Sequence, residues 1–172
     1  MSYKAPFILS NGHLQTIYPS LFRKLDDSFL QRVVINTVDG DFINVDKATC
    51  GNPGKRVVIV SHGLEGHSRR PYILGMANAL IEQDWDIIAW NFRSCGGEMN
   101  HRLRFYHSGA TEDLAALIDY AKSCGYEQIG LVGFSMGGNL SLVDLGQQEE
   151  SIKEHICGAI VFSVPCDLAA SA

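Results

Sequence analysis

The chain has 172 residues, of which 46% are hydrophobic and 19% are charged, and its formal net charge is −5. These values are ordinary for one soluble globular domain, so residues 1–172 are expected to form a single domain. The net negative charge argues against nonspecific binding to nucleic acid or anionic lipid.

No apolar run is long enough to cross a bilayer, and the N-terminus lacks the apolar core of a signal peptide. The five cysteines are scattered without a C-x-x-C pair, which favours a reducing compartment over a disulfide scaffold. We therefore expect a cytoplasmic protein. No motif calls for a cofactor or a metal ion.

Apolar runs and amphipathic stretches alternate along the chain and predict its elements in order. Two strands joined by an Asp39-Gly40 turn come first and predict an antiparallel hairpin. Strands are then expected at 55–63, 85–92, 127–134 and 157–165, with helices at 70–84, 111–125 and 136–148 between them.

The helix predicted at 111–125 has the clearest end signals. Thr111 is expected to cap it, Glu112 and Asp113 follow at the positive end of the helix dipole, and Gly125 should stop it. Strands that alternate with helices imply an α/β fold, with a mostly parallel sheet and helices on both faces. Ligands in such sheets bind at the carboxyl ends of the strands.

A G-x-S-x-G motif, Gly133 to Gly137, lies between the strand predicted at 127–134 and the helix predicted at 136–148. In this setting the serine stands on a sharp strand-to-helix turn, where a Cβ at either glycine would collide with neighbouring chain. The helix N-terminus behind it favours developing negative charge. Ser135 is therefore the candidate nucleophile, and the alternative is an incidental serine in a glycine-rich turn.

A second glycine-rich loop, after the strand at 55–63, can supply part of an oxyanion hole. The oxyanion of a tetrahedral intermediate needs two hydrogen-bond donors. One should be the backbone N–H of Met136, directly after the serine, and the other that of Leu64 in this loop. We expect His62 to brace the loop rather than carry a proton, and nothing marks His67 as a base.

Five segments together give the chain a resemblance to the YheT-like branch of the α/β-hydrolase superfamily. They are NGHLQTIYP near the start, SHGLEGHSRRPYILGMANAL, NFRSCGGEMN, FYHSGATEDL and VGFSMGGNLSLVDLG. The resemblance implies the α/β-hydrolase fold and hydrolysis of carboxylic esters or acylglycerols by a Ser-Asp-His triad. It also implies that some relatives transfer acyl groups to alcohols.

Through this resemblance Ser135 matches the nucleophile of the family, and Leu64 and Met136 match its oxyanion positions. His13 is expected to belong to an N-terminal arm that docks on the sheet. Four further loop residues match the family and are expected to be structural or to line the substrate: Arg93, Glu98, Tyr106 and His107.

The acid and the histidine of the implied triad are not evident after Ser135. In this fold the chain order is Ser, Asp, His. The only later histidine, His155, precedes the last predicted strand and therefore belongs to the opposite end of the sheet. Asp167 follows that strand, at the correct end, and is a candidate acid. We therefore expect a fold that is cut after its sixth strand, with the C-terminal part that completes the triad missing.

Three functions remain open at this point. The first is an esterase or acylglycerol lipase that forms an acyl-enzyme on Ser135. The second is an acyltransferase, because alcohols and water compete for the same acyl-enzyme. The third is a binding module that kept the pocket without the catalytic histidine. The expected partner is a small ester or lipid, and the last strand is expected to expose an edge through which the chain self-associates.

Overall fold

The computed structural model of the chain describes residues 4–51, 55–147 and 154–171. Its elements follow one another as η1 (Phe7–Leu9), α1 (Gly12–Phe22), β1 (Gln31–Asn36), β2 (Phe42–Ala48), β3 (Arg56–Ser61), α2 (Pro71–Ile81), β4 (Asp86–Trp90), α3 (Thr111–Ser123), β5 (Gln128–Phe134), α4 (Met136–Gln147) and β6 (Ile156–Phe162). In this part of the chain six strands form one sheet, in the order β1-β2-β4-β3-β5-β6.

The sheet is mostly parallel and carries an antiparallel hairpin at one edge. Strands β4, β3, β5 and β6 run parallel to one another, whereas β2 pairs antiparallel with both β1 and β4. The hairpin turn contains Gly40 at a φ of 74°, a left-handed conformation that glycine adopts without strain. The predicted hairpin and the predicted parallel sheet are therefore confirmed.

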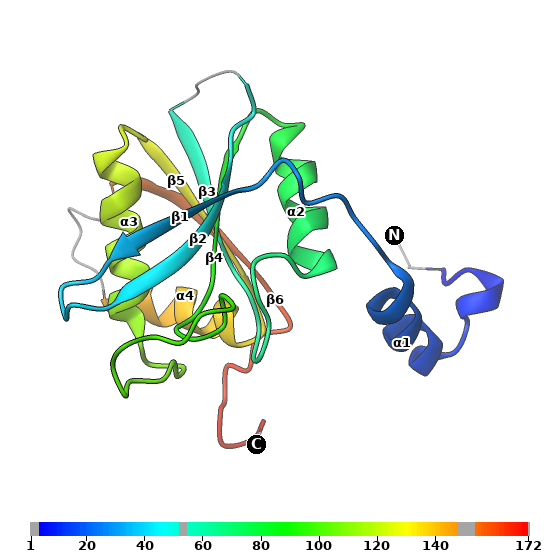
Figure 1. Cartoon of the computed structure of the whole chain (residues 1–172). Coiled ribbons are helices and arrows are strands. Elements are labelled where there is room, and N and C mark those ends of the chain that lie inside the picture. The colour runs from blue at the N-terminus through cyan, green and yellow to red at the C-terminus, as the bar shows by residue number, and fades with distance from the viewer. Residues whose placement is uncertain (1–3, 52–54, 148–153, 172) are drawn as a thin grey trace.

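Helices cover both faces of the sheet, as the alternating sequence pattern predicts (Figure 1). Helix α2 buries Ile73, Leu74 and Ala77 in a cluster with residues of β3 and β4. Helices α3 and α4 lie on the other face, where Leu117 and Leu140 join a second core cluster. Two separate apolar layers thus hold the parallel strands between them, and the strands are buried on both faces.

The ends of α3 confirm one prediction and correct another. Gly125 follows the helix at a φ of 88°, in the left-handed conformation expected of a residue that terminates a helix. Thr111 is not the cap, because it is the first helical residue. Ala110 precedes it and offers no side-chain cap. The Thr111 hydroxyl instead donates to the side chain of Gln147 in α4 at 3.2 Å. Asp113 is buried in an ion pair with Arg93, a role that its place in the first helical turn did not indicate.

The N-terminal segment is helical and does not lie on the sheet, contrary to expectation. Helix α1 stands to one side of the domain (Figure 1) and buries none of its residues, and His13 is exposed. Asn11 caps the helix by accepting the N–H of His13 at 2.8 Å. The apolar residues of α1 point outward: Leu14, Ile17, Tyr18, Leu21 and Phe22 are all exposed. No helix among the described residues is both long and apolar enough to span a bilayer.

Strand β6 forms the outer edge of the sheet and pairs only with β5 in the described residues. Helix α4 packs against one face of this strand and buries part of Ile156 and Ala159, so one face of the strand is covered. Ile160, at 61% exposure, and Phe162, at 39%, remain open to solvent. An exposed apolar edge strand offers unpaired N–H and C=O groups to another chain.

We expect the 172-residue chain to self-associate through β6. Analytical ultracentrifugation should show a concentration-dependent rise in sedimentation coefficient, and Ile160→Lys should reduce it, because a charge on an edge strand opposes strand addition. Val34→Lys, on β1 at the opposite edge, serves as the matched control. A monodisperse monomer at every concentration would contradict this expectation.

Candidate active site

Ser135 stands alone between the end of β5 and the start of α4, on a sharp turn. Its φ of 51° lies in the left-handed region, which is uncommon for a residue with a side chain and is associated with functional sites. The turn is held at both ends. The Ser135 N–H donates to the Phe162 carbonyl at 2.8 Å, and the Ser135 carbonyl accepts the Asn139 N–H at 3.0 Å.

Glycines allow this turn to approach its neighbours, as the motif predicts. A Cβ on Gly133 would lie 2.5 Å from the Gly138 Cα and 2.6 Å from the Gly137 carbonyl oxygen. A Cβ on Gly137 would lie 2.6 Å from the Ser61 carbonyl oxygen and closer still to that of His62. All of these atoms are backbone atoms, so the collisions cannot be relieved by a side-chain rotation.

The loop after β3 runs directly beside Ser135. A Cβ built on Gly63 would lie 3.3 Å from the Ser135 Cβ and 3.9 Å from its Oγ. Leu64 and Met136, the two candidate oxyanion positions, line one cavity together with Ser135, with a volume of about 540 Å³. The structure thus brings together the three residues that the two glycine-rich segments single out.

The Gly63 peptide is held by hydrogen bonds on both sides. Its N–H donates to the Tyr72 hydroxyl at 3.1 Å, and its carbonyl accepts the Gly66 N–H at 3.0 Å and lies 2.7 Å from the Nδ1 of His62. Sequence reasoning missed Tyr72. Its position after Pro71 at the start of α2 gives no signal that its hydroxyl reaches back nine residues to the loop.

His62 is a buried structural residue, as expected. Its Nε2 accepts the Phe92 N–H at 3.1 Å, so its Nδ1 carries the proton that bonds the Gly63 carbonyl. Burial is the main cause that lowers the pKa of His62 to about 4. Both ring nitrogens are occupied and the ring stays neutral, so His62 positions the loop and is not free to accept a proton from Ser135.

Acidification should therefore destabilise the fold before its carboxylates titrate. Below pH 6.5 the unfolded chain protonates this histidine and the native His62 does not, so the free energy of unfolding should fall by up to about 3 kcal/mol between pH 6.5 and 4. Urea melts across this range would measure the slope. His62→Gln should flatten it and the exposed His13→Gln should not. Equal slopes in wild type and His62→Gln would contradict the assignment.

The other loop residues that match the family are structural or lie beside the site. Arg93 is buried and makes a bidentate ion pair with Asp113. The Tyr106 hydroxyl accepts the Glu65 N–H at 3.4 Å and so contacts the loop next to Leu64. His107 lines a narrow cavity with Met136 on the core side, and its Nδ1 accepts the Gly109 N–H at 3.1 Å. Glu98 is exposed.

Among the residues that the structure describes, no triad acid or histidine lines the cavities at Ser135. His155 directly precedes β6 and its carbonyl pairs with Ile129 at the start of β5, which places it at the opposite end of the sheet. Asp167 lies after β6, at the same end as Ser135, but its carboxylate accepts the Ala170 N–H at 3.0 Å. In the described part of the chain, the residues that line the two cavities containing Ser135 include no histidine and no carboxylate.

The cavity beside Ser135 has a mixed lining. Its apolar residues away from the loop are Met136 of α4 and Val164, Pro165 and Leu168 of the segment after β6. The lining also includes Ser163 and Ser171 of the same segment, and Ser108. Asn139 of α4 fixes this segment, because its side-chain amide donates to the Pro165 carbonyl at 3.1 Å. No group of three or more His, Cys, Asp or Glu side chains among the described residues could hold a metal ion.

Comparison with known proteins places this site in a class. A family model described as alpha/beta hydrolase fold matches residues 56–170. The chain therefore belongs to the alpha/beta hydrolase fold family. The match runs from the start of β3 through the segment after β6, so it contains both the Gly63–Leu64 loop and the Ser135 turn.

The chain is similar to several named esterases and lipases. It is 36% identical over 163 residues to the protein named "Putative esterase YheT" of Escherichia coli. This alignment covers 91% of this chain and 46% of that protein. It is 27% identical over 210 residues to the monoacylglycerol lipase of Saccharomyces cerevisiae, covering 96% and 46%. It is 32% identical over 139 residues to human phospholipase ABHD3, covering 76% and 34%. The chain thus spans less than half the length of these relatives.

Solved structures share the fold. The esterase Pf2001 of Pyrococcus furiosus superposes with a TM-score of 0.69 at 23% identity, covering 81% of this chain and 53% of that one. The serine hydrolase XC6422 of Xanthomonas campestris superposes with a TM-score of 0.66 at 21% identity, covering 84% and 66%. At these identities the likeness establishes the fold alone.

Proposed function

We propose that the chain carries the nucleophile and oxyanion hole of a serine hydrolase that acts on carboxylic esters or acylglycerols. The observation that carries the proposal is the left-handed φ of Ser135 on the turn between β5 and α4, with the Gly63–Leu64 loop packed against its side chain. Its relatives carry the names of an esterase, a monoacylglycerol lipase and a phospholipase, which supports ester substrates.

The proposed reaction uses Ser135 twice. A general base takes the proton of the serine hydroxyl as its Oγ bonds to the ester carbonyl carbon. The N–H groups of Leu64 and Met136 stabilise the oxyanion. The alcohol then leaves as the C–O bond breaks, with the proton returned by the base. Water next attacks the acyl-enzyme, and the carboxylic acid leaves as Ser135 regains its proton.

We propose that the acid and the histidine of the triad come from chain beyond residue 172. Two observations support this. No histidine or carboxylate among the described residues lines the Ser135 cavities, and the chain spans less than half the length of its named relatives. Asp167 stays the alternative acid, because it lies at the Ser135 end of the sheet.

The 172 residues by themselves should hydrolyse p-nitrophenyl butyrate negligibly. A serine without a base is a weak nucleophile, and loss of one triad member lowers kcat by roughly four or more orders of magnitude. Steady-state assays of the wild type and Ser135→Ala should give indistinguishable rates. Robust hydrolysis that disappears in Ser135→Ala would show that a base lies within these residues and would overturn the proposed origin of the triad.

A further inference from the structure

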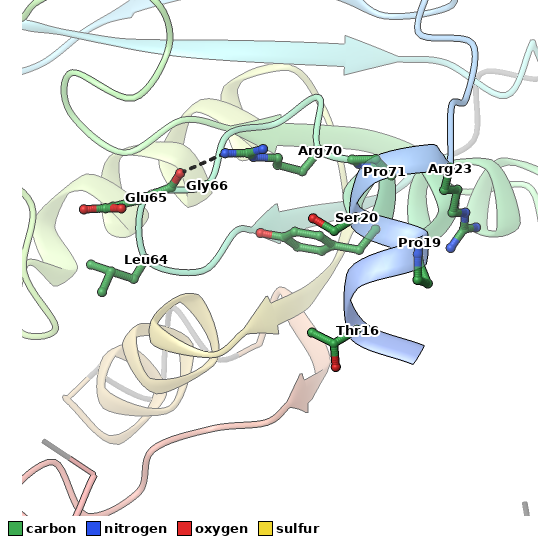
Figure 2. Close-up of a pocket in the computed structure, with 10 residues that line it drawn as sticks. Thr16, Pro19, Ser20, Arg23, Leu64, Glu65, Gly66, Arg70 and Pro71 are labelled. Carbon is green, nitrogen blue, oxygen red and sulfur yellow. Dashed lines mark hydrogen bonds between the residues drawn. The ribbon is translucent and has the colours of Figure 1, made fainter. Parts of the chain in front are cut away.

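A polar pocket lies on the other side of the Gly63–Leu64 loop from the cavity beside Ser135. It has a volume of about 430 Å³ and opens between α1 and the loop that joins β3 to α2 (Figure 2). Helix α1 turns its polar face toward this pocket through Thr16 and Ser20, and Arg23, directly after the helix, also lines it. The apolar face of α1 lies on the opposite side of the helix from this polar face. It therefore points away from the pocket, to solvent.

The pocket offers more hydrogen-bond donors than acceptors. Arg23 and Arg70 line it, and neither makes an ion pair within the described residues. Arg70 makes one hydrogen bond, to the Glu65 carbonyl at 3.5 Å, which leaves most of its five donors free. Figure 2 shows the Glu65 side chain directed away from Ser20 and Pro71, so the one carboxylate in the lining does not face the pocket centre.

Two hydroxyl groups add to this excess of donors. The Tyr72 hydroxyl accepts the Gly63 N–H, which leaves its own proton available to a ligand. The Ser20 hydroxyl makes no hydrogen bond within the described residues. A pocket with the Arg70 guanidinium and two hydroxyl donors favours a ligand that is rich in acceptors and negatively charged, and a phosphate group has both properties.

The pocket shares lining residues with the two cavities at Ser135. Leu64 lines the polar pocket and both cavities that contain Ser135, and Tyr72 lines the polar pocket and one of them. An ester carbonyl held at Ser135 would therefore have a cavity with apolar residues such as Met136 and Leu168 on one side of the Gly63–Leu64 loop, and a donor-rich pocket on the other. The acyl chain fits the first by its chemistry, and the alcohol part fits the second.

We propose that the pocket between α1 and the Gly63–Leu64 loop binds the alcohol part of the substrate and selects esters whose alcohol carries a phosphate, such as acylated glycerol phosphate. This assignment rests on the proposed function for its link to catalysis. Arg70 is the main contact in this assignment, because it lies on the loop beside Ser135, whereas Arg23 is held against Gly75 of α2.

Direct binding tests the pocket without turnover. Isothermal titration calorimetry of the 172-residue chain should show binding of glycerol 3-phosphate at least about tenfold tighter than that of glycerol, because a charge-assisted contact to Arg70 is added. Arg70→Gln should weaken the binding of glycerol 3-phosphate by about tenfold or more. Arg56→Gln removes an equal charge at the start of β3, at the opposite end of the sheet, and should leave it unchanged.

A lipid ligand separates the two possible sources of the phosphate. An oleoyl lysophosphatidate below its micellar concentration should bind tighter than glycerol 3-phosphate, because its acyl chain also occupies the cavity beside Ser135. Equal binding of the two would assign the pocket to a free phosphate ester and overturn its role in substrate recognition. Equal binding of glycerol and glycerol 3-phosphate, or an unchanged affinity in Arg70→Gln, would overturn the phosphate site itself.

The same titrations distinguish this proposal from the proposed chemistry. Ser135→Ala should bind glycerol 3-phosphate like the wild type, because the hydroxyl of Ser135 does not line the polar pocket. Binding of glycerol 3-phosphate by a chain whose Ser135 a fluorophosphonate does not label, even with imidazole present, would uphold the pocket and refute the hydrolase. A reactive Ser135 in a chain that does not bind glycerol 3-phosphate would uphold the hydrolase and refute the phosphate pocket.

Discussion

Gly137→Ala should lower the free energy of unfolding by more than about 4 kcal/mol, which is among the largest losses that single substitutions cause. The added Cβ would meet the carbonyl oxygens of Ser61 and His62, and both belong to the chain at the end of β3. Neither can move without displacing the central strand β3 and the Gly63–Leu64 loop together. Urea denaturation followed by circular dichroism measures the loss.

Gly146→Ala is the matched control for this substitution, because it adds the same methyl group to the same helix. No atom lies within 4 Å of a Cβ at Gly146, so the exchange should stabilise α4 by up to about 1 kcal/mol. A loss below about 1 kcal/mol in Gly137→Ala would mean that the turn is not packed against β3 as closely as the structure has it.

Arg93→Met should cost about 3–5 kcal/mol, because it leaves buried carboxylates without their cation. The guanidinium contacts Asp113 and Asp39 at 2.7 Å, and Asp41 at 3.3 Å. The hydrogen bond from Arg93 is the main cause that lowers the pKa of Asp39 to about 2. The stability that this contact adds is present above pH 3.8 and is lost as the pH falls toward 2, so the difference between variant and wild type should shrink in acid.

Thermal melts at neutral pH compare this variant with Arg104→Met, which removes an exposed ion pair to Glu112. The control should change the free energy of unfolding by less than about 1 kcal/mol, because solvent screens exposed pairs. Equal effects of the two variants would contradict the structural role of Arg93.

Local sequence patterns predict most of this fold because each element is encoded within its own residues. Strand β3 is an unbroken β-branched run, and α3 has its apolar stripe together with Gly125 at its end. Helix α1 escaped prediction although Asn11 and the apolar spacing from Leu14 to Phe22 signal a helix, because Pro19 interrupts it and the apolar face meets no core. Thr111 was misassigned as a cap because its partner, Gln147, belongs to another helix.

Some residues of the candidate site could be predicted from the sequence, and others could not. Ser135, Met136 and Leu64 could be named from two short segments, because a glycine-bounded turn fixes its own geometry. The roles of Tyr72 and Arg70 could not be named, because they depend on how α2 and α1 pack beside the Gly63–Leu64 loop. Such contacts depend on how a loop folds back on a helix start and have no periodic signature in the sequence.

Chemical rescue of Ser135 tests the central claim most directly. The 172-residue chain would be treated with a fluorophosphonate, with and without imidazole as an external base, and the modified residue would be identified by peptide mass spectrometry. The account predicts slow labelling by itself and labelling at least about tenfold faster with imidazole, because the base is the part of the triad that is supplied. The adduct should lie on Ser135 and be absent from Ser135→Ala. Labelling that imidazole does not accelerate, or an adduct on any other residue, would contradict the assignment of Ser135 as the nucleophile.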